Sequence, residues 1–186
     1  MSGMVVLIGV AVVVVLLVAW VIGTFNGLVR RRNQVRNAWS QIDVQLQRRH
    51  DLIPNLVETV KGFAAHERGV LETVTAARAR AVAAGGPAER AEAENALTGA
   101  LRSLFAVSEA YPTLTSNPSF LSLQEELASS ESKVAYARQY YNDAVTSYNN
   151  AIGTFPAVML AGVLGFQGAE HFETRGDERD AVRVQF

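Results

Sequence analysis

Residues 35–60, VRNAWSQIDVQLQRRHDLIPNLVETV, carry the pattern that decides the fold. Apolar side chains recur there in steps of threes, fours and sevens, the spacing of a helix face that packs against partner helices. Arg49 stands in the same phase, so the pattern predicts that its guanidinium is buried. The apolar members of this face are Val35, Trp39, Ile42, Leu46, Ile53, Leu56 and Val60.

Burial of an unpaired guanidinium costs several kcal/mol, roughly, so Arg49 needs a carboxylate partner. Asp51, Glu58 or a residue of another helix could supply it. Two interpretations of the polar residues around this point remain open. The favoured one is a buried network that fixes how the helices pack, and the other is a partner-binding or ligand-binding patch. The cluster consists of Arg48, Arg49, Asp51, Asn55 and Lys61.

The same apolar spacing continues through residue 81, resumes at residue 123 and predicts an all-α chain. No window shows a convincing period of two, which argues against β-strands. Glu67 and Ser130 are the other polar residues that stand in the apolar phase. The spacing runs through Phe63, Val70, Val74, Ala77 and Ala81, and later through Leu123, Leu127, Val134, Ala137, Tyr141, Ala144 and Tyr148.

Helix boundaries follow from prolines, glycines and capping residues. Asp51 is placed to cap a helix with Pro54 in its first turn, which predicts a break near His50, and a single helix kinked at Pro54 is the alternative. Gly85, Gly86 and Pro87 mark the next boundary, followed by Pro112 and by Asn117 before Pro118. The predicted helices are 33–50, 51–84, 88–111 and 118–152, and their short connections predict a long antiparallel four-helix bundle over residues 30–156.

Residues 4–22, MVVLIGVAVVVVLLVAWVI, form an uninterrupted apolar run before this domain. As a helix rising about 1.5 Å per residue, the run comes close to the ~30 Å hydrocarbon core of a bilayer. A cleaved signal peptide is the alternative, but its apolar stretch is shorter and follows basic residues. Trp20 and Phe25 fall where interfacial aromatic residues lie. We therefore expect residues 1–29 to be a retained single-pass transmembrane anchor.

Charge predicts the orientation of this anchor in the cell membrane. Residues 1–29 have no charged side chain, residues 30–50 carry a net charge of +5, and residues 51–186 carry −6. The positive-inside rule then favours an external N-terminus and a cytoplasmic C-terminal domain, with the reverse topology as the alternative. The membrane-proximal basic collar is Arg30, Arg31, Arg32 and Arg36. We expect it to contact anionic lipid, and a solvated helix face is the other interpretation.

The C-terminal region divides into an apolar segment and a charged tail. Residues 157–166 are apolar but too short to span a bilayer, so they either pack on the bundle, as we favour, or touch the membrane interface. Residues 157–173 are therefore assigned to a segment packed on the bundle. Residues 174–186 are charged and without periodicity, and we expect them to be disordered. In the fourth helix, Tyr141 and Tyr148 share the apolar phase, whereas Tyr136 and Tyr140 do not.

No motif predicts catalysis, a cofactor or a metal. The chain has no cysteine, which excludes disulfides and thiolate metal sites. His50, His66 and His171 show no i, i+4 pairing, and Glu-x-x-His, phosphate-loop and G-x-S-x-G motifs are absent from the sequence. His66 and Glu67 are adjacent, so on a helix they point about 100° apart and do not face one site. An acidic domain without interleaved basic and aromatic residues also makes nucleic acid a poor partner.

Residues 26–67, which include AWSQIDVQL and DLIPNLVETVKG, resemble the signature of the LemA family. The resemblance continues with EAYP at 109–112, NPSFLSLQEEL at 117–127, YARQYYNDAVTSYN at 136–149 and FP followed by GFQGAEHFE at 155–173. It implies one N-terminal membrane helix and a bundle of long helices, and it implies no chemistry. Phe25 stands where a tyrosine is common in the family, and TLTSN at 113–117 replaces a loop that often carries a lysine.

These observations favour a non-catalytic scaffold or interaction module held at the membrane. Its expected partners are the lipid bilayer and an unidentified protein, with a second copy of the chain as an alternative to the latter. The competing hypothesis is a membrane-tethered enzyme or ligand receptor that uses the polar cluster near Arg49 and Asp51. A structure in which those groups pair with each other, without a concave pocket beside them, would contradict that hypothesis.

Overall fold

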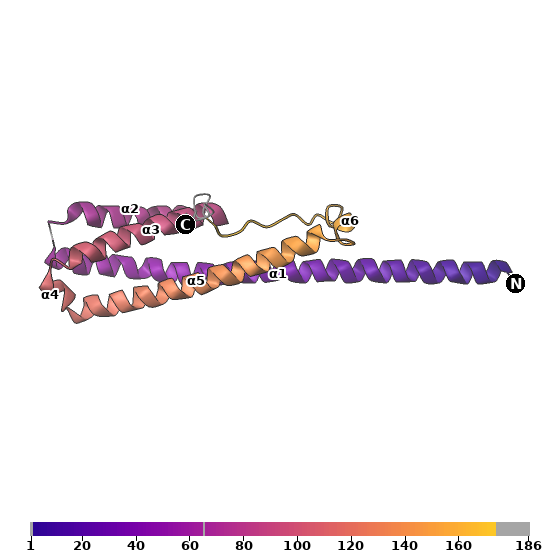
Figure 1. The fold of residues 1–186 in the computed structure, drawn as a ribbon, viewed down its shortest axis with the longest axis horizontal. Helices are drawn as coiled ribbons and strands as arrows, with labels where there is room; N and C mark the ends of the chain where they lie inside the picture. Colours follow the sequence, from indigo (N-terminus) through magenta and orange to yellow (C-terminus); the bar gives the residue numbers. More distant parts are fainter. Residues whose placement is uncertain (1, 65, 174–186) are drawn as a thin grey trace, which may run out of the picture. The chain divides into compact units, whose positions relative to one another are not determined.

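The computed structural model describes residues 2–64 and 66–173, and in these residues every regular element is a helix. The all-helical prediction is therefore confirmed. The described residues form six helices, and Figure 1 shows their order along the chain. They are α1 (Ser2–Phe63), α2 (Arg68–Ala83), α3 (Pro87–Ser108), α4 (Pro112–Thr115), α5 (Pro118–Gly153) and α6 (Val158–Ala161).

The predicted break near His50 is wrong, because α1 continues through Pro54 and ends at Phe63. The single helix predicted over 51–84 is wrong as well, because the chain leaves the helix after Phe63 and α2 begins at Arg68. A proline inside a helix removes the hydrogen bond to the carbonyl four residues earlier and costs ~3 kcal/mol or more. Here that carbonyl belongs to His50, and the Nε atom of Arg78 donates to it at 2.7 Å. The apolar face also keeps its phase across the proline, so burial on both sides favours one continuous helix.

The other boundaries lie close to those that the prolines predicted. The helices predicted over 88–111 and 118–152 correspond to α3 and α5, and Pro87 stands in the first turn of α3. Asn117 caps α5, since its Oδ1 atom accepts from the backbone N–H groups of Ser119 and Phe120. The short helix α4 lies within the connection that was predicted as a loop.

The chain divides into two compact units, and α1 and α5 each contribute to both. Unit 1 comprises Met1–Trp39 and Asp143–Ala169, and unit 2 comprises Ser40–Asn142 and Glu170–Phe186. The core of unit 2 lies where α2 and α3 pack against each other and against α1 and the start of α5 (Figure 1). Its fully buried members include Ile53, Leu56, Val60, Val74, Leu97, Leu104, Leu114 and Phe120.

Burial in unit 2 follows the predicted apolar phase with few exceptions. Phe63 belongs to that phase but is 41% exposed, because α1 ends there. Ser130 stands in the phase and is buried, and its hydroxyl donates to the Leu127 carbonyl at 2.8 Å. A buried polar group needs such a partner, so this serine fits the face at little cost.

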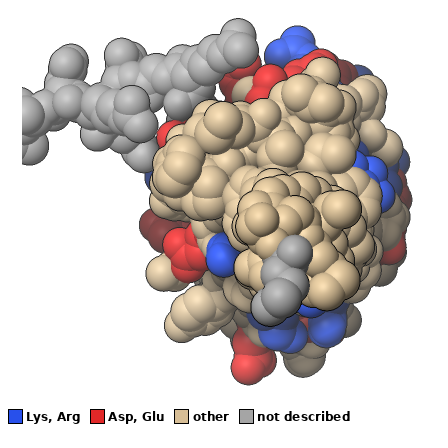
Figure 2. Space-filling view, turned by 90° about the vertical axis from the view of Figure 1, so that its right-hand side faces the viewer, with Lys and Arg blue, Asp and Glu red and all other residues tan. Residues whose placement is uncertain are grey.

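Unit 1 differs in that the apolar part of α1 is exposed. Ser2–Phe63 includes one stretch long and apolar enough to cross a membrane, and none of that stretch is buried. Figure 2 views this end of α1 along the helix, and its surface carries no charged side chain. Burial in unit 1 begins only beyond the apolar run, at Leu28, Val35 and Ala38 of α1 and at Ala144, Val145 and Tyr148 of α5.

Asparagine side chains of α5 hold the chain that follows α6 by its backbone, once in each unit. In unit 2, Asn142 accepts from the N–H of Phe172 at 2.8 Å and donates to its carbonyl at 3.4 Å. In unit 1, Asn149 forms the same pair with Ala169, at 2.9 Å in both directions. Each asparagine side-chain amide thus gives one backbone residue both an acceptor for its N–H and a donor for its C=O. A neighbouring strand or water would otherwise have to supply these two partners.

The end of the described chain is therefore ordered. In unit 2, the Phe172 ring is 1% exposed and lies 5.0 Å from the guanidinium carbon of Arg138. The Tyr141 hydroxyl donates to the Glu170 carbonyl at 2.8 Å. The tail predicted to be disordered, 174–186, lies outside the described residues.

Candidate functional site

A buried ionic cluster lies between α1 and α3 in unit 2. Arg49 and His50 are neighbours on α1, and Glu94 and Thr98 are one turn apart on α3. One Glu94 oxygen accepts from Arg49 Nη1 at 3.1 Å, and the other lies 2.6 Å from His50 Nε2. Arg49 Nη2 donates to the Thr98 hydroxyl at 2.7 Å. The carboxylate is thus held between two neighbouring side chains of α1.

Burial makes this pairing obligatory. Arg49 and Glu94 are each 3% exposed and His50 is 5% exposed. Moving one such ion out of water costs several kcal/mol, roughly, and the cost is recovered only when charge and hydrogen bonds are matched. With Glu94 ionised beside Arg49, the two formal charges cancel, and His50 Nε2 must donate the proton in its contact. The cluster therefore fixes the position of α3 on α1.

A third helix joins the cluster at its backbone. The His50 carbonyl lacks its usual helical donor because residue 54 is a proline. Arg78 of α2 donates to this carbonyl, so α2 is tied to α1 at the same turn that carries Arg49 and His50. Three helices of unit 2 therefore meet within one turn of α1.

The structure brings Arg49 into this cluster and leaves the other predicted members outside it. The expectation that Arg49 pairs with a carboxylate is confirmed, and of the candidates it is a residue of another helix, Glu94, that supplies it. The structure does not bring all five residues together, because the other four are exposed on the surface of α1. There Arg48 lies 4.0 Å from Glu126, Asp51 accepts from Gln47 at 2.8 Å, Lys61 lies 3.4 Å from Glu58, and Asn55 is exposed.

Sequence reasoning missed His50, Glu94, Thr98 and Arg78. Glu94 had a detectable signal, since it follows Ala91 by three residues and precedes Leu97 by three on a predicted helix. That spacing places it on the buried face. His50 and Arg78 had no such signal, because their roles depend on which helices become neighbours.

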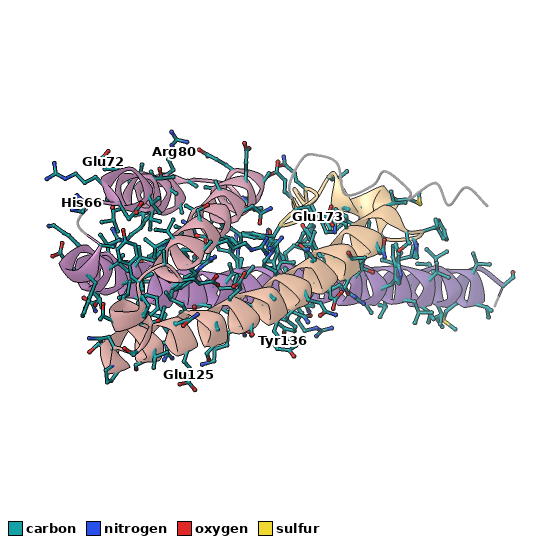
Figure 3. The ribbon with its side chains drawn as sticks, turned by 60° about the vertical axis from the view of Figure 1, so that its left-hand side comes forward. His66, Glu72, Arg80, Glu125, Tyr136 and Glu173 are labelled. Atoms are coloured by element: carbon teal, nitrogen blue, oxygen red, sulfur yellow. The ribbon has the colours of Figure 1, made fainter. Side chains whose placement is uncertain are left out.

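Two further polar contacts connect the helices of unit 2. Arg90 of α3 forms an ion pair with Asp43 of α1. The Tyr111 hydroxyl donates to the Glu67 carboxylate at 2.9 Å, so the glutamate that stood in the apolar phase also has a partner. This hydrogen bond, with smaller contributions from desolvation and the Glu67 charge, raises the pKa of Tyr111. His66, in the connection after α1, is exposed (Figure 3).

Hollows adjoin the cluster on two sides. One of about 210 Å³ is lined by Arg49, Arg102 and Gln124, among others, and one of about 480 Å³ is lined by Asp43, His50 and others. The first is smaller than the ~300 Å³ at which ligand pockets begin. The buried charged groups pair with each other, which argues against a ligand site. Hollows nevertheless lie beside them, so the second condition for excluding a ligand site is not met. The described residues contain no group of three His, Cys, Asp or Glu side chains that could hold a metal ion.

A larger groove lies on the outer surface of unit 2, between α1 and α2. Its volume is about 590 Å³, and Val57, Leu71, Ala76 and Ala79 supply much of its apolar lining. Charged residues border it, among them Glu58, Lys61, Arg68 and Glu72. Figure 3 shows Glu72 and Arg80 pointing away from α2. The groove is an open surface that combines an apolar floor with a charged rim.

The tyrosines of α5 divide as their phase predicted. Tyr141 and Tyr148 are buried, whereas Tyr136 is 74% exposed and Tyr140 is 43% exposed. Tyr136 points away from the helix in Figure 3. Burial of its ring and the neighbouring charge of Glu170 raise the pKa of Tyr141.

The basic collar of unit 1 is partly engaged in contacts. Arg31 donates to the Ser147 hydroxyl at 2.5 Å, and the Arg32 guanidinium lies 5.1 Å from the centre of the Phe166 ring. Arg30 and Arg36 are exposed. These contacts place the basic collar beside α5 and the segment that follows it.

The sequence pattern of the LemA family matches residues 38–186 and confirms the resemblance. Magnetosome protein MamQ 2 of Paramagnetospirillum magneticum is 28% identical over 188 residues, which cover 87% of this chain and 69% of the relative. Magnetosome protein MamQ of Magnetospirillum gryphiswaldense is 28% identical over 177 residues, covering 81% and 65%. Protein LemA of Metamycoplasma hominis is 26% identical over 162 residues, covering 85% and 73%.

Proposed function

The chain belongs to the LemA family, and from this premise we propose that it is a single-pass membrane protein whose helical domain is a non-catalytic interaction scaffold. Three of its relatives are named after the magnetosome rather than after a reaction. That naming accords with a structural role.

The membrane anchor is residues 1–29. Its support is the exposed apolar stretch of α1, which has no protein partner among the described residues to cover it. The basic collar favours an external N-terminus and a cytoplasmic domain. Fusion of a phosphatase reporter, active only outside the cytoplasm, to Phe186 tests this orientation. We expect no activity, and activity would reverse the topology.

The helices beyond the anchor form an antiparallel four-helix bundle in this proposal. Supporting it are the short connections between α1, α2 and α3, and the coiled-coil-like spacing of the buried faces of α1 and α5. Distances between spin labels on α2 and α3 measure the arrangement. Labels at Thr73 and Arg102 should be closer than labels at Thr73 and Glu89, since antiparallel helices joined at 84–86 bring the far ends together.

The scaffold role rests chiefly on the buried cluster, in which Arg49 and His50 use both oxygens of Glu94 for contacts within the protein. Groups engaged in this way serve packing rather than a substrate. The groove between α1 and α2, in contrast, presents apolar side chains within a charged rim on the outside. An apolar surface with a polar rim is typical of protein interaction sites.

Photocrosslinking in the native membrane tests the role. A photoreactive amino acid at Ala76, within the groove, should capture one defined protein or a second copy of the chain. The same group at Glu125, an exposed position on α5, serves as the control and should capture neither. Ala76→Glu should abolish association with the captured protein, because it places a charge on the apolar floor of the groove. If both positions gave the same diffuse products, the scaffold proposal would lose its support.

A further inference from the structure

Residues 155–166, FPAVMLAGVLGF, contain no polar side chain, and α6 lies within this segment. Hydrogen bonds continue the helical turn on both sides of α6, from the Val158 N–H that donates to Thr154 to the Leu164 N–H that donates to Leu160. A helix that is apolar on every side is ordinarily buried in a protein core or in a membrane. In unit 1 this one lies beside the end of α5 (Figure 1).

One face of the segment packs on the protein. Ala161 and Phe166 are 4% and 5% exposed, and the Phe166 ring lies 5.6 Å from the Phe25 ring of α1 in an edge-to-face arrangement. Gly165 has a φ of 73°, and the Phe166 N–H donates to the Ala161 carbonyl while the Gly165 N–H donates to the Gly162 carbonyl. This is the Schellman arrangement, in which a left-handed glycine ends a helix and turns the chain. It directs Phe166 onto α1.

The other face is open to solvent. Phe155 is 78% exposed, Val158 49%, Met159 67% and Val163 88%. These four apolar side chains come from a stretch of nine residues without an intervening charge. Contiguous apolar surface of this kind marks a contact with a partner or a membrane.

The contacts of Phe166 indicate which of these two, a partner or a membrane, meets the exposed face. Phe25, which it contacts, lies three residues beyond the apolar run that ends at Ile22. The guanidinium above the Phe166 ring belongs to Arg32, a residue of the basic collar. Aromatic and basic residues at the end of a spanning helix lie at the level of the lipid headgroups. The exposed face therefore lies at that level too, beside the anchor.

We propose that residues 155–163 insert their exposed apolar face into the membrane interface beside the anchor. This rests on the proposed function, since the level of the bilayer is defined by α1 as the spanning helix. An interfacial helix buries its apolar side about 5–10 Å into the boundary between headgroups and acyl chains. The segment is then a second, non-spanning lipid contact that fixes the tilt and rotation of unit 1 on the membrane surface.

The absence of cysteine from the chain permits a direct test with single labels. Val163→Cys and Met159→Cys carry a nitroxide label on the proposed lipid face, and their exposure means that the substitutions leave the core intact. Leu17→Cys reports on the anchor, and Ser129→Cys, exposed on α5 in unit 2, is the aqueous control. Full-length protein is reconstituted in vesicles of phosphatidylethanolamine and phosphatidylglycerol. Collisions with oxygen, which concentrates in lipid, are compared with collisions with a water-soluble nickel chelate.

We expect oxygen to dominate at Val163→Cys, Met159→Cys and Leu17→Cys, and nickel to dominate at Ser129→Cys. Nickel dominance at Val163 and Met159, with oxygen dominance at Leu17, would overturn the interfacial contact and leave the anchor standing. Nickel dominance at Leu17 would overturn the anchor itself. Low access to both reagents at Val163, with dipolar broadening between labels, would show that a second copy covers the face and would also overturn the lipid contact.

Discussion

The two units of this protein place charge and apolar surface in opposite ways. Unit 2 buries Arg49, His50 and Glu94 in its interior, while unit 1 leaves an apolar stretch of α1 and the side chains around α6 exposed. A buried ion is tolerated where every charge has a partner, and an exposed apolar face is tolerated where water is not the solvent. The contrast accords with the proposed anchor, in which unit 1 would meet lipid and unit 2 water, although the same two long helices contribute to both.

Removal of the Glu94 charge should have the largest effect on this contrast. Glu94→Gln leaves Arg49 buried without a counter-ion, and such a loss costs about 3–5 kcal/mol of unfolding free energy. Urea unfolding of the full chain in detergent, followed by far-UV circular dichroism, measures the change. Glu92→Gln, at an exposed position of the same helix, is the matched control and should change stability by less than ~0.5 kcal/mol.

Replacement of the whole cluster tests whether its charges stabilise the fold or only determine how the helices pack. Arg49→Met, His50→Leu and Glu94→Leu together should be neutral or stabilising, because apolar residues avoid the desolvation cost. A cost for Glu94→Gln no larger than that of Glu92→Gln would contradict the structural role of the cluster.

Asn142 should have the next largest effect, because it satisfies both backbone groups of a buried residue. Asn142→Ala leaves the N–H and C=O of Phe172 without these partners, at about 1–3 kcal/mol for a buried unsatisfied group. Hydrogen exchange of the Phe172 amide should rise strongly in this variant. Unchanged protection of that amide would mean that Asn142 does not hold the C-terminal segment.

Replacement of Gly165 tests the turn in unit 1 that directs Phe166 onto α1. Gly165→Ala places a side chain at a φ of 73°, which costs roughly 1–2 kcal/mol for residues other than glycine. Nothing lies within 4 Å of the added methyl, so backbone strain is the whole effect. A nitroxide label on Val163→Cys should become more mobile in this variant, because the turn loosens. Gly162→Ala, in the right-handed helical region, is the control and should leave the label unchanged.

The smallest expected effect is the response of unit 2 to alkaline pH. Burial raises the pKa of Tyr141 above its value in the unfolded chain, about 10. The contribution of its neutral phenol is therefore complete below pH ~10 and is lost as the pH rises through the folded pKa. Tyr141→Phe should flatten this alkaline loss of stability relative to the native chain, whereas Tyr136→Phe, at an exposed position, should not. Equal slopes for all three proteins would contradict the prediction.

The sequence predicted what depends on local pattern. Helix type, the exposed apolar run and the boundaries at Pro87 and Pro118 all follow from periodicity and punctuation along the chain. The position of Arg49 on a buried face also followed, since spacing alone sets the phase. Its partner could not be identified, because Glu94 lies 45 residues away and reaches Arg49 only once α3 packs on α1.

The same limit explains the wrong break at His50. Pro54 disfavours a continuous helix when the local chain is considered alone, and the compensating donor, Arg78, lies on another helix. The two faces of residues 155–163 also depended on long-range contact, since composition showed the segment to be apolar but not which side chains would meet α1. Tertiary partners decided each of these points.

The contact between Arg78 and the His50 carbonyl has a consequence for the order of assembly. Before α2 is in place, the turn of α1 at Pro54 lacks a hydrogen bond and is its weakest point, so a peptide of residues 35–63 should fray or bend there in solution. Extension of the peptide to residue 84 adds the missing donor from outside the helix. Nuclear magnetic resonance of both peptides should then show helical order across residues 50–54 only in the longer one. Helical order at this turn would then depend on its neighbour and be complete only once α2 docks.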